Sequence, residues 1–388
     1  MKLTIVEFLD QLTLQEWGLI GAFLFLYLVR LYYLVFFTGR LVIKQRKEVI
    51  ANEQATQAIS VLLTVRNEEE NLKRLLPELL SINTVKYEVI AVDDFSLDNT
   101  YSVIGSFRQK YKHFKISSLN EETRFSAKLA QNIALKAAQN DWVLMLPVDA
   151  HDLNHDWLGG FAVNTATSYR NVMVGYNRIQ AHPGWYNLLY RIENFEQQIR
   201  SAGFISNGIP FVYFEENVAF RKKEYFDIGG YGQKTKEPYA NLELIINQFI
   251  TRKNTVLLLN QDTSLSREIK TERDDFYNLL ERSYRIERYL PKWKRGVLAL
   301  ETITQVLFLP FLLLVLFLFF DLWPVIASLS GFLFLGRIIM IKIVQNRLNE
   351  RKIFISSLVY GMLMTYFKLF YRWYFSQTNR NNKWKIKV

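Results

Sequence analysis

Residues 60–80 read SVLLTVRNEEENLKRLLPELL, and residues 87–100 read YEVIAVDDFSLDNT. Each stretch opens with a run of β-branched and other apolar residues that is typical of a buried strand. In the first stretch the polar Arg66-Asn67-Glu68 follows the strand, and leucines then recur at helical spacing. The second strand likewise leads into a helical pattern that ends near Tyr111. This alternation of strand and helix predicts a parallel sheet with right-handed crossovers.

Acidic and amide side chains follow the predicted strands at the point where each strand ends. The three groups are Asn67-Glu68, Asp93-Asp94 and, after a later strand, Asp149. In such sheets ligands bind beyond the carboxyl ends of the strands. These side chains therefore suit the uridine or ribose of a nucleotide and a divalent cation on its phosphates.

Helix capping is the alternative role for such residues, because Asn, Asp and Ser also belong at the start of a helix. We favour capping for Ser96 and Asp98, which shortly precede the helix predicted from Thr100. For Asp93 and Asp94 we favour ligand binding, because they are adjacent and directly follow an apolar strand.

The composition excludes several classes of protein. Hydrophobic residues make up 50% of the 388 residues, so the chain is neither disordered nor fibrous. Cysteine is absent, which excludes a disulfide scaffold, cysteine nucleophiles and thiolate metal sites. The 4 histidines lack the helical pairing that is typical of a zinc hydrolase.

The net charge of +11, from 48 basic and 37 acidic residues, admits an anionic partner. Most of the surplus flanks the apolar segments, and the chain lacks a basic, aromatic-bearing face on a recognisable nucleic-acid module. We therefore expect the lipid bilayer as a partner and no nucleic acid, and the charge also admits a nucleotide diphosphate.

Residues 17–37 form the first predicted membrane span. These 21 residues carry a single charge and can cross about 30 Å of hydrocarbon as a helix. A signal peptide is excluded by the length of the apolar run and by the lack of a small-residue cleavage site. Acidic residues precede the span and basic residues follow it, so residues 1–16 are expected to be extracytoplasmic and the middle of the chain cytosolic. The chain is then a multi-pass protein of the cytoplasmic membrane.

Two more spans are predicted at residues 297–320 and 325–344. Arg337 and Lys342 lie in the last third of the second of these, from where long basic side chains can snorkel to the membrane surface. Residues 353–375 leave two alternatives open: a fourth span, which would place basic residues outside against the charge rule, or a re-entrant or interfacial segment. So few spans argue against a transporter and leave room for a partner subunit in the membrane.

Residues 273–295 are predicted to form an amphipathic helix at the membrane interface. Basic residues occur among apolar residues that recur at helical spacing, and they suit anionic lipid headgroups. The apolar residues are Phe276, Leu279, Leu280, Ile286, Leu290 and Trp293.

Four stretches, in this order, resemble the motifs of family 2 glycosyltransferases of GT-A fold. Residues 60–80 and 87–100 resemble the opening of that domain, with one strand ending in Asn-Glu and the next in Asp-Asp. SAKLAQNIALKAAQNDWVLMLPVDA at residues 126–150 resembles the family's helix and the strand with its DxD motif. FEENVAFRKKEYFDIGGYG at residues 214–232 resembles the acceptor-side stretch. The resemblance extends over about residues 58–259.

The resemblance implies an α/β fold with a GT-A nucleotide-diphospho-sugar transferase domain at residues 51–271. Such a domain has a Rossmann-like mixed sheet and is here flanked by transmembrane helices, as in members that make polysaccharides or lipid-linked sugars. It also implies transfer of a sugar from a nucleotide-diphospho-sugar to a polysaccharide or lipid-linked acceptor, with inversion.

Site residues follow from the resemblance position by position. Those expected at the nucleoside are Asn67, Glu68, Asp93 and Asp94. Asp149 matches the second aspartate of DxD, which implies a Mg or Mn cation on the diphosphate. Asn217 and Arg221 fall in the acceptor-side stretch.

Two departures from the family pattern affect the chemistry. Pro147 stands at the first aspartate of DxD, so half of the metal site is missing. Ala240 and Asn241 stand where the family has a Glu-Asp pair whose Asp is the general base, and a neutral amide has no useful basicity. Glu237 is the candidate for a substitute base, whereas Glu243 matches a helical position with a structural role.

A third departure concerns the Gln-x-x-Arg-Trp motif of membrane polysaccharide synthases. Arg285-Ile-Glu-Arg288-Tyr289 keeps its spacing, and Arg282-Ser-Tyr-Arg285-Ile286 is an equally good register. These arginines bind either the acceptor or diphosphate, or only lipid. Two functions therefore stay open: an unorthodox membrane glycosyltransferase, or a degenerate relative that binds nucleotide sugar, glycan or a partner enzyme without turnover.

Overall fold

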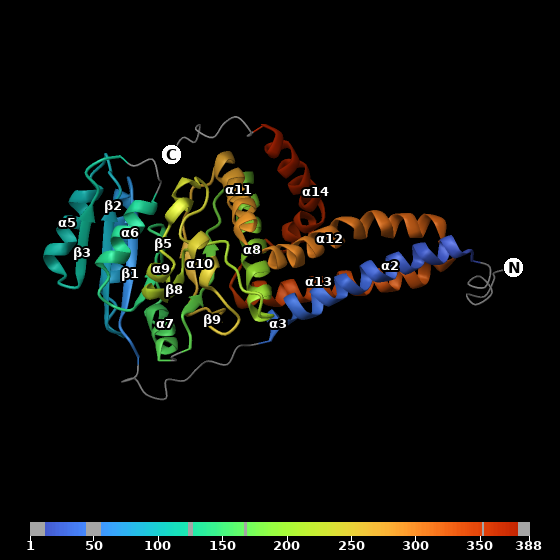
Figure 1. Cartoon of the computed structure of the whole chain (residues 1–388), viewed down its shortest axis with the longest axis horizontal. Helices are drawn as coiled ribbons and strands as arrows, with labels where there is room; N and C mark the ends of the chain where they lie inside the picture. Colours follow the sequence, from blue (N-terminus) through green and yellow to red (C-terminus); the bar gives the residue numbers. More distant parts are fainter. Residues whose placement is uncertain (1–11, 44–55, 123–126, 167–168, 351–352, 379–388) are drawn as a thin grey trace. The chain divides into compact units, whose positions relative to one another are not determined.

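The computed structural model describes residues 12–43, 56–122, 127–166, 169–350 and 353–378. The chain divides into two compact units, which are described separately (Figure 1). The helical unit comprises Met1–Ile43, Pro291–Asn346 and Phe354–Lys383, and the α/β unit consists mainly of Lys44–Leu290 together with Arg347–Ile353.

A sheet of seven strands forms the centre of the α/β unit, in the order β3-β2-β1-β4-β8-β6-β9. The strands are β1 Ile59–Val65, β2 Tyr87–Asp93, β3 Phe114–Ser118, β4 Trp142–Met145, β6 Val172–Val174, β8 Val218–Arg221 and β9 Thr255–Leu257. All neighbours are parallel except β8, which runs antiparallel to both β4 and β6. The sheet is therefore mixed, as the family resemblance implied, whereas strand–helix alternation alone predicted a parallel sheet.

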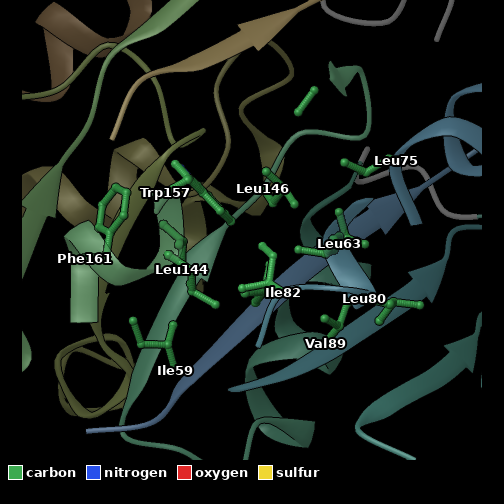
Figure 2. Close-up of a cluster of buried hydrophobic side chains, with 14 of the residues drawn as sticks. Ile59, Leu63, Leu75, Leu80, Ile82, Val89, Leu144, Leu146, Trp157 and Phe161 are labelled. Atoms are coloured by element: carbon green, nitrogen blue, oxygen red, sulfur yellow. The ribbon is translucent and has the colours of Figure 1, made fainter. Parts of the chain in front are cut away.

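Helices cover this sheet because their apolar faces are too large to leave in water. They are α4 Glu69–Leu80, α5 Thr100–Lys110, α6 Lys128–Ala137, α7 Trp157–Thr165, α8 Trp185–Ser206, α9 Lys222–Asp227, α10 Glu243–Phe249 and α11 Arg273–Tyr289. In the core, Leu63 of β1 lies with Leu75 of α4, and Trp157 of α7 lies near Leu144 of β4 (Figure 2). Burying each such side chain stabilises the fold by about 1.5–3 kcal/mol.

A second, three-stranded sheet is built beside the main one in the order β5-β10-β7. Its strands are β5 Ala150–His151, β7 Asn177–Ile179 and β10 Leu265–Arg267. β5 directly follows the residues that match DxD, so β10 brings the late residue Arg267 opposite Ala150. This pairing determines the surroundings of Asp149.

The predicted helix at residues 273–295 is in fact two helices. α11 ends at Tyr289, and α12 begins at Lys292 after Pro291. Proline cannot donate the helical hydrogen bond and clashes with the preceding turn, which explains the break. α11 packs against α8 and α10, and Phe276, Leu280 and Ile286 are buried. The apolar face that was predicted to lie on lipid is therefore covered by protein.

The helical unit contains four long helices. They are α2 Leu14–Tyr32, which continues through a π-helical segment Tyr33–Thr38 into α3 Gly39–Val42, α12 Lys292–Leu318, α13 Trp323–Arg347 and α14 Phe354–Thr378. Among the described residues, these four are long and apolar enough to cross a membrane. α12 packs against α2 and α14, and the Tyr33 hydroxyl donates to the Val297 carbonyl at 2.9 Å.

The structure bears on the alternatives for residues 353–375. This segment lies in α14, a continuous helix of 25 residues. At 1.5 Å per residue its length is about 37 Å, enough for a full crossing. A re-entrant segment would need a reversal that this helix does not contain, so a fourth span and an interfacial helix are the alternatives that stay open.

Candidate nucleotide and acid–base site

Asp93 and Asp94 close β2 at the carboxyl edge of the sheet, and their roles differ. The Asp93 carboxylate accepts a hydrogen bond from the Ser96 hydroxyl, which commits it to the turn. The Asp94 backbone N–H donates to the Val65 carbonyl at 2.8 Å, while its carboxylate is 4% exposed. Its Oδ1 has no hydrogen-bond partner among the described residues. Burial raises the pKa of Asp94, and the positive charge of Arg66 opposes this shift.

Asn67 joins the loops that follow β1 and β2. Its φ of 55° places it in the left-handed region, where asparagine is among the tolerated residues. The Asn67 N–H donates to the Ser96 hydroxyl at 2.9 Å, and its side-chain oxygen accepts from the Leu97 N–H at 2.8 Å. The amide oxygen is thus already used in positioning the two loops.

Glu68 lies at the same edge of the sheet, and its carboxylate takes less part in holding the loops together. Its backbone N–H donates to the Thr100 hydroxyl at 2.8 Å, and Asn71 donates to one carboxylate oxygen at 2.6 Å. Burial raises the pKa of Glu68 despite the Asn71 hydrogen bond, and the charges of Asp149 and Asp98 raise it further. The three predicted groups of polar residues therefore meet at one edge of the sheet.

Asp98 caps helices, as the sequence predicted. One oxygen accepts from the Thr100 N–H at 3.0 Å at the start of α5, and the other accepts from the Glu69 N–H at 3.3 Å at the start of α4. The same prediction for Ser96 is wrong. Its hydroxyl connects Asp93 with Asn67, because the turn after β2 places it between two loops instead of at a helix N-terminus.

Asp149 is held by an arginine. Arg267 Nε and Nη2 donate to its two oxygens at 2.7 and 2.8 Å, and Arg267 also lies 3.4 Å from Glu216. Such a two-bond pair is among the strongest polar contacts in proteins. Within the part of the chain that the structure describes, no group of three or more His, Asp or Glu side chains could hold a metal ion. With Pro147 at the other DxD position, the residues as arranged do not fit a protein-held Mg or Mn cation.

A buried cluster of carboxylates around Arg282 was not predicted. Arg282 Nε donates to Glu243 at 2.7 Å, and its terminal nitrogens lie 3.3 Å from the Glu216 oxygens. Burial alone would raise the pKa of Glu216, but Arg282 and Arg267 together lower it to about 2. Glu243 is fully buried, which agrees with the structural role expected for it.

Glu215 is the uncompensated member of this cluster. It accepts from Gln131 Nε2 at 2.7 Å and from the Leu242 N–H at 2.5 Å. Burial raises its pKa well above the usual value, and the negative charges of Glu243 and Glu216 act in the same direction.

Lys128 lies between the two predicted base positions. Its ammonium donates to the Glu237 carbonyl at 2.6 Å and to the Asn241 side-chain oxygen at 3.2 Å. The Glu237 carboxylate has longer contacts: the Tyr289 hydroxyl at 3.3 Å, the Tyr239 N–H at 3.4 Å and Arg285 at 3.9 Å. Burial lowers the pKa of Lys128, although nearby carboxylates favour its charged form. The structure therefore brings Asn241 and Glu237 to the same ammonium group.

Asn217 is a structural centre of the α/β unit. Its side chain is fully buried; the amide donates to the carbonyls of Tyr176 and Thr263 at 3.0 and 2.9 Å and accepts from the Trp157 indole at 3.0 Å. Its φ is 59°, and a Cβ on Gly175 would come within 2.3 Å of the amide. All of its polar atoms are used inside the protein.

Arg221 lies far from the other site residues. It pairs with Trp142 across β8 and β4, and Trp142 in turn pairs with Ile59 at the start of β1. Asp93 pairs with Val65 at the opposite end of β1, six residues or about 20 Å away. The antiparallel direction of β8 explains this position, which the sequence alone did not reveal. Arg221 instead stacks over the Trp142 ring at 5.0 Å.

The two possible registers of the motif on α11 involve Arg282, Arg285 and Arg288. The first two of these arginines contact carboxylates of the site. Arg282 contacts Glu216 and Glu243, and Arg285 lies 2.5 Å from Glu281 and 3.9 Å from Glu237. Arg288 lies in the last turn of α11. Both arginines of the register that begins at Arg282 therefore contact carboxylates of the site.

Sequence reasoning missed Lys128, Glu215, Glu216 and Arg267 as site residues, and it considered Arg282 only as part of the Gln-x-x-Arg-Trp register. One signal was available: Glu215-Glu216 interrupts the apolar run FVYFEENVAF, and charged residues become buried only when they are paired. The identity of the pairing residues could not be read from the sequence.

Comparison with known proteins identifies the domain. Residues 60–229 match the model of glycosyl transferase family 2. The domain belongs to glycosyltransferase family 2. The solved mannosyltransferase PcManGT from Pyrobaculum calidifontis, in complex with GDP-Man and Mn2+, covers 90% of this chain with a TM-score of 0.54 and 16% identity, over 98% of its own length. The likeness confirms the GT-A fold of this family 2 domain.

Curated relatives match a shorter part of this family 2 protein. An uncharacterised glycosyltransferase of Synechocystis sp. is 30% identical over 124 residues, which is 29% of this chain and 38% of the relative. The poly-β-1,6-N-acetyl-D-glucosamine synthase of Staphylococcus epidermidis is 34% identical over 101 residues, 26% of this chain and 24% of the synthase. The matched part thus spans well under half of these relatives.

Proposed function

We propose that this protein is a membrane-bound glycosyltransferase that transfers a sugar from a nucleotide-diphospho-sugar to a polysaccharide or lipid-linked acceptor, with inversion. The buried, unpartnered Oδ1 of Asp94 carries this proposal, because it lies at the carboxyl edge of a family 2 domain. The name of the staphylococcal relative, a polysaccharide synthase, supports a glycan acceptor.

Asp94 is proposed to bind the nucleoside. A buried acceptor without a donor destabilises the protein by about 1–3 kcal/mol, which a ligand N–H or O–H group would offset. Nucleobases and ribose both supply such donors. Glu68 lies beside the same loop, while Asp93 and Asn67 hold the loop in place through Ser96.

Glu237 is proposed as the general base. Inversion in a single step requires a group that takes the proton of the acceptor hydroxyl, and the amide of Asn241 cannot do so. Glu243 is fully buried and uses one oxygen in an ion pair with Arg282 at 2.7 Å, while its other oxygen has no hydrogen-bond partner among the described residues. Glu215 accepts two short hydrogen bonds. Within the described part of the chain, the Glu237 carboxylate contacts the Tyr289 hydroxyl, the Tyr239 N–H and Arg285 at 3.3 Å or longer. Its position beside Lys128 and Asn241 matches the family's base region.

Binding without turnover is the second candidate function. The pairing of Asp149 with Arg267 and the amide at position 241 favour it, because both replace groups on which family chemistry depends. Here Arg267 supplies the positive charge beside Asp149, and no reaction step is assigned to a metal.

A donor panel separates the two candidates. The protein in detergent is incubated with UDP- and GDP-sugars, with manganese or with EDTA, and released nucleoside diphosphate is measured together with donor binding by calorimetry. If nucleoside diphosphate is released, and Asp94→Asn reduces that release by lowering the affinity for the donor, the result supports the transferase. Binding that depends on Asp94 without any release supports the second candidate. Donor binding unaffected by Asp94→Asn would falsify the assigned nucleotide site.

The proposed location is the cytoplasmic membrane, with the α/β domain in the cytosol. Basic residues near the helix ends support this: Arg40 lies in the last turn of the first long helix, and Lys292, Lys294 and Arg295 open α12. A membrane partner subunit stays a prediction.

A further inference from the structure

A cavity of about 370 Å³ lies within the helical unit, lined by all four of its long helices. α2 contributes Arg30, α12 contributes Gln305, α13 contributes Arg337 and α14 contributes Gly361. Ionisable residues inside membrane-spanning helices are expensive to bury and mark functional sites by default. Two arginines in one cavity therefore require an explanation.

Both arginines lie on the side of the cavity towards the helix ends that carry basic flanking residues. Arg30 is 12 residues before the end of the first long helix at Val42, and Arg337 is 10 residues before the end of α13 at Arg347. At 1.5 Å per residue these positions are about 18 and 15 Å inside the helix ends. Long basic side chains can reach from there towards a lipid headgroup.

Two guanidinium groups line the cavity, those of Arg30 and Arg337. They are close enough for their charges to interact, and the charge of Glu301 also acts on Arg30. Two guanidinium groups facing one cavity suit an anionic group such as a phosphate.

The cavity is shaped around the Arg337 guanidinium. A Cβ on Gly361 would come within 2.4 Å of Arg337 Nη2, so glycine leaves the space that the guanidinium occupies. Gln305 donates to the Thr365 hydroxyl at 2.8 Å, and the Tyr366 hydroxyl donates to the Val306 carbonyl at 3.0 Å. These bonds fix α12 on α14 and form a firm wall.

The remainder of the cavity is mostly apolar and lies deeper between the helices. Phe308, Leu312 and Phe334 line it, together with Ser330. The Ser330 hydroxyl is buried and has no partner among the described residues. A cationic end joined to an apolar end is complementary to an amphiphile, whereas a free anion would leave the apolar part unused.

We propose that this cavity binds a lipid through its phosphate group, held by Arg30 and Arg337, with an apolar chain along Leu312 and Phe334. This inference rests on the membrane insertion proposed above. It deepens the proposed function by assigning a place for a lipid phosphate, the chemistry that a lipid-linked acceptor carries.

Lipid binding is tested on the full-length protein in dodecyl maltoside. Dioleoyl phosphatidic acid is the probe, and dioleoylglycerol and inorganic phosphate are the controls; bound ligand is counted by native mass spectrometry and by calorimetry. We expect saturable binding of one phosphatidic acid per chain. Neither control should bind at the same concentration. Equal binding of inorganic phosphate would show an anion site without lipid preference and overturn the proposal.

Variants identify the site. Arg30→Gln and Arg337→Gln should each weaken phosphatidic acid binding about tenfold or more, because each loses a charged contact with the phosphate. Arg30→Lys and Arg337→Lys, which keep the charge, should retain part of the affinity. Lys342→Gln is the matched control, since Lys342 is a basic residue of α13 that lies over the Phe354 ring and does not line the cavity.

Two readouts keep the result interpretable. Size-exclusion profiles and thermal unfolding followed by circular dichroism show whether each variant is folded. Unchanged lipid affinity in folded Arg30→Gln and Arg337→Gln means that the arginines serve helix packing with Glu301, and the proposal fails. Lipid binding is measured without nucleotide sugar, so failure of the glycosyltransferase assignment leaves this test unaffected.

Discussion

At the scale of single residues, cations occupy the places that matter most in the site. Arg267 takes both oxygens of Asp149, Arg282 joins Glu216 to Glu243, and Lys128 connects Asn241 with Glu237. Each of these cations occupies side-chain oxygens that could otherwise contact a substrate. Within the described residues, Asp94 Oδ1 has no hydrogen-bond partner, and the Glu237 carboxylate contacts its neighbours at 3.3 Å or longer.

Replacing Glu237 tests the proposed base. Glu237→Gln should lower kcat about 100-fold or more and leave the KM for the donor within about threefold, because the amide cannot take the acceptor proton. The measurement is steady-state release of nucleoside diphosphate. Glu70→Gln, on the exposed surface of α4, is the matched control. An unchanged kcat would assign the base elsewhere.

Asn241→Asp tests the same region in the opposite direction. The new carboxylate would lie beside Lys128, whose ammonium is 3.2 Å from the present amide oxygen and would keep it ionised. In the Glu237→Gln background we expect kcat to recover by about tenfold or more. Asn241→Ala in that background should give no recovery. If both variants behave alike, position 241 does not face the acceptor.

Arg267→Met tests why a metal does not fit. Removing the guanidinium frees both oxygens of Asp149. We expect donor binding to become dependent on manganese in the variant, whereas EDTA should change the affinity of the unmodified protein less than about threefold. The thermal midpoint should fall, because loss of one partner of a buried pair destabilises by about 3–5 kcal/mol. Strong manganese dependence in the unmodified protein would contradict the interpretation of Arg267.

At the scale of elements, the connection between α13 and α14 is tied into the α/β unit. The Tyr176 hydroxyl donates to Glu350 at 2.7 Å, and Arg191 lies 3.8 Å from the other carboxylate oxygen. Burial raises the pKa of Glu350 to about 7, despite the opposing effect of Tyr176 and Arg191. A short loop thereby carries a buried group that titrates near neutral pH.

Glu350 should make stability depend on pH. Its pKa is higher in the folded state than the usual 4.5, so the unfolded state loses its proton first and stability falls as pH rises from about 4.5 to about 7. Glu350→Gln, which resembles the protonated form, should raise the thermal midpoint at pH 8 and change it little at pH 5. Glu70→Gln should show no such difference. A stabilisation of equal size at both pH values would contradict this account.

At the scale of the whole molecule, four apolar helices accompany one family 2 domain. The absence of cysteine makes the side of the membrane directly measurable, because a single introduced cysteine has no background. Thr4→Cys should react with an impermeant maleimide in intact cells. Ser106→Cys, exposed on α5, should react only after lysis. The reverse pattern would overturn the proposed orientation.

Much of the fold was predictable because it depends on local patterns. Leucine spacing predicted α4, the apolar runs predicted β1 and β2, and the long apolar segments predicted the helices of the helical unit. The break at Pro291 and the antiparallel β8 were not predicted. The break at Pro291 follows from the local effect of proline, which the continuous apolar periodicity across it obscured. The antiparallel β8 follows from the direction of the chain, about which periodicity carries no information.

The sequence by itself determined the strand–helix alternation, the apolar helices and the carboxylates at the sheet edge, because each is encoded by neighbouring residues. Only the tertiary structure decided which of those carboxylates are neutralised. Arg267 reaches Asp149 across 118 positions of the chain, and Lys128 reaches Asn241 across 113. Such pairings depend on how strands and helices are brought together in space. Residue types and spacing therefore predicted where the site lies, and long-range ion pairs determine which of its carboxylates stay available for chemistry.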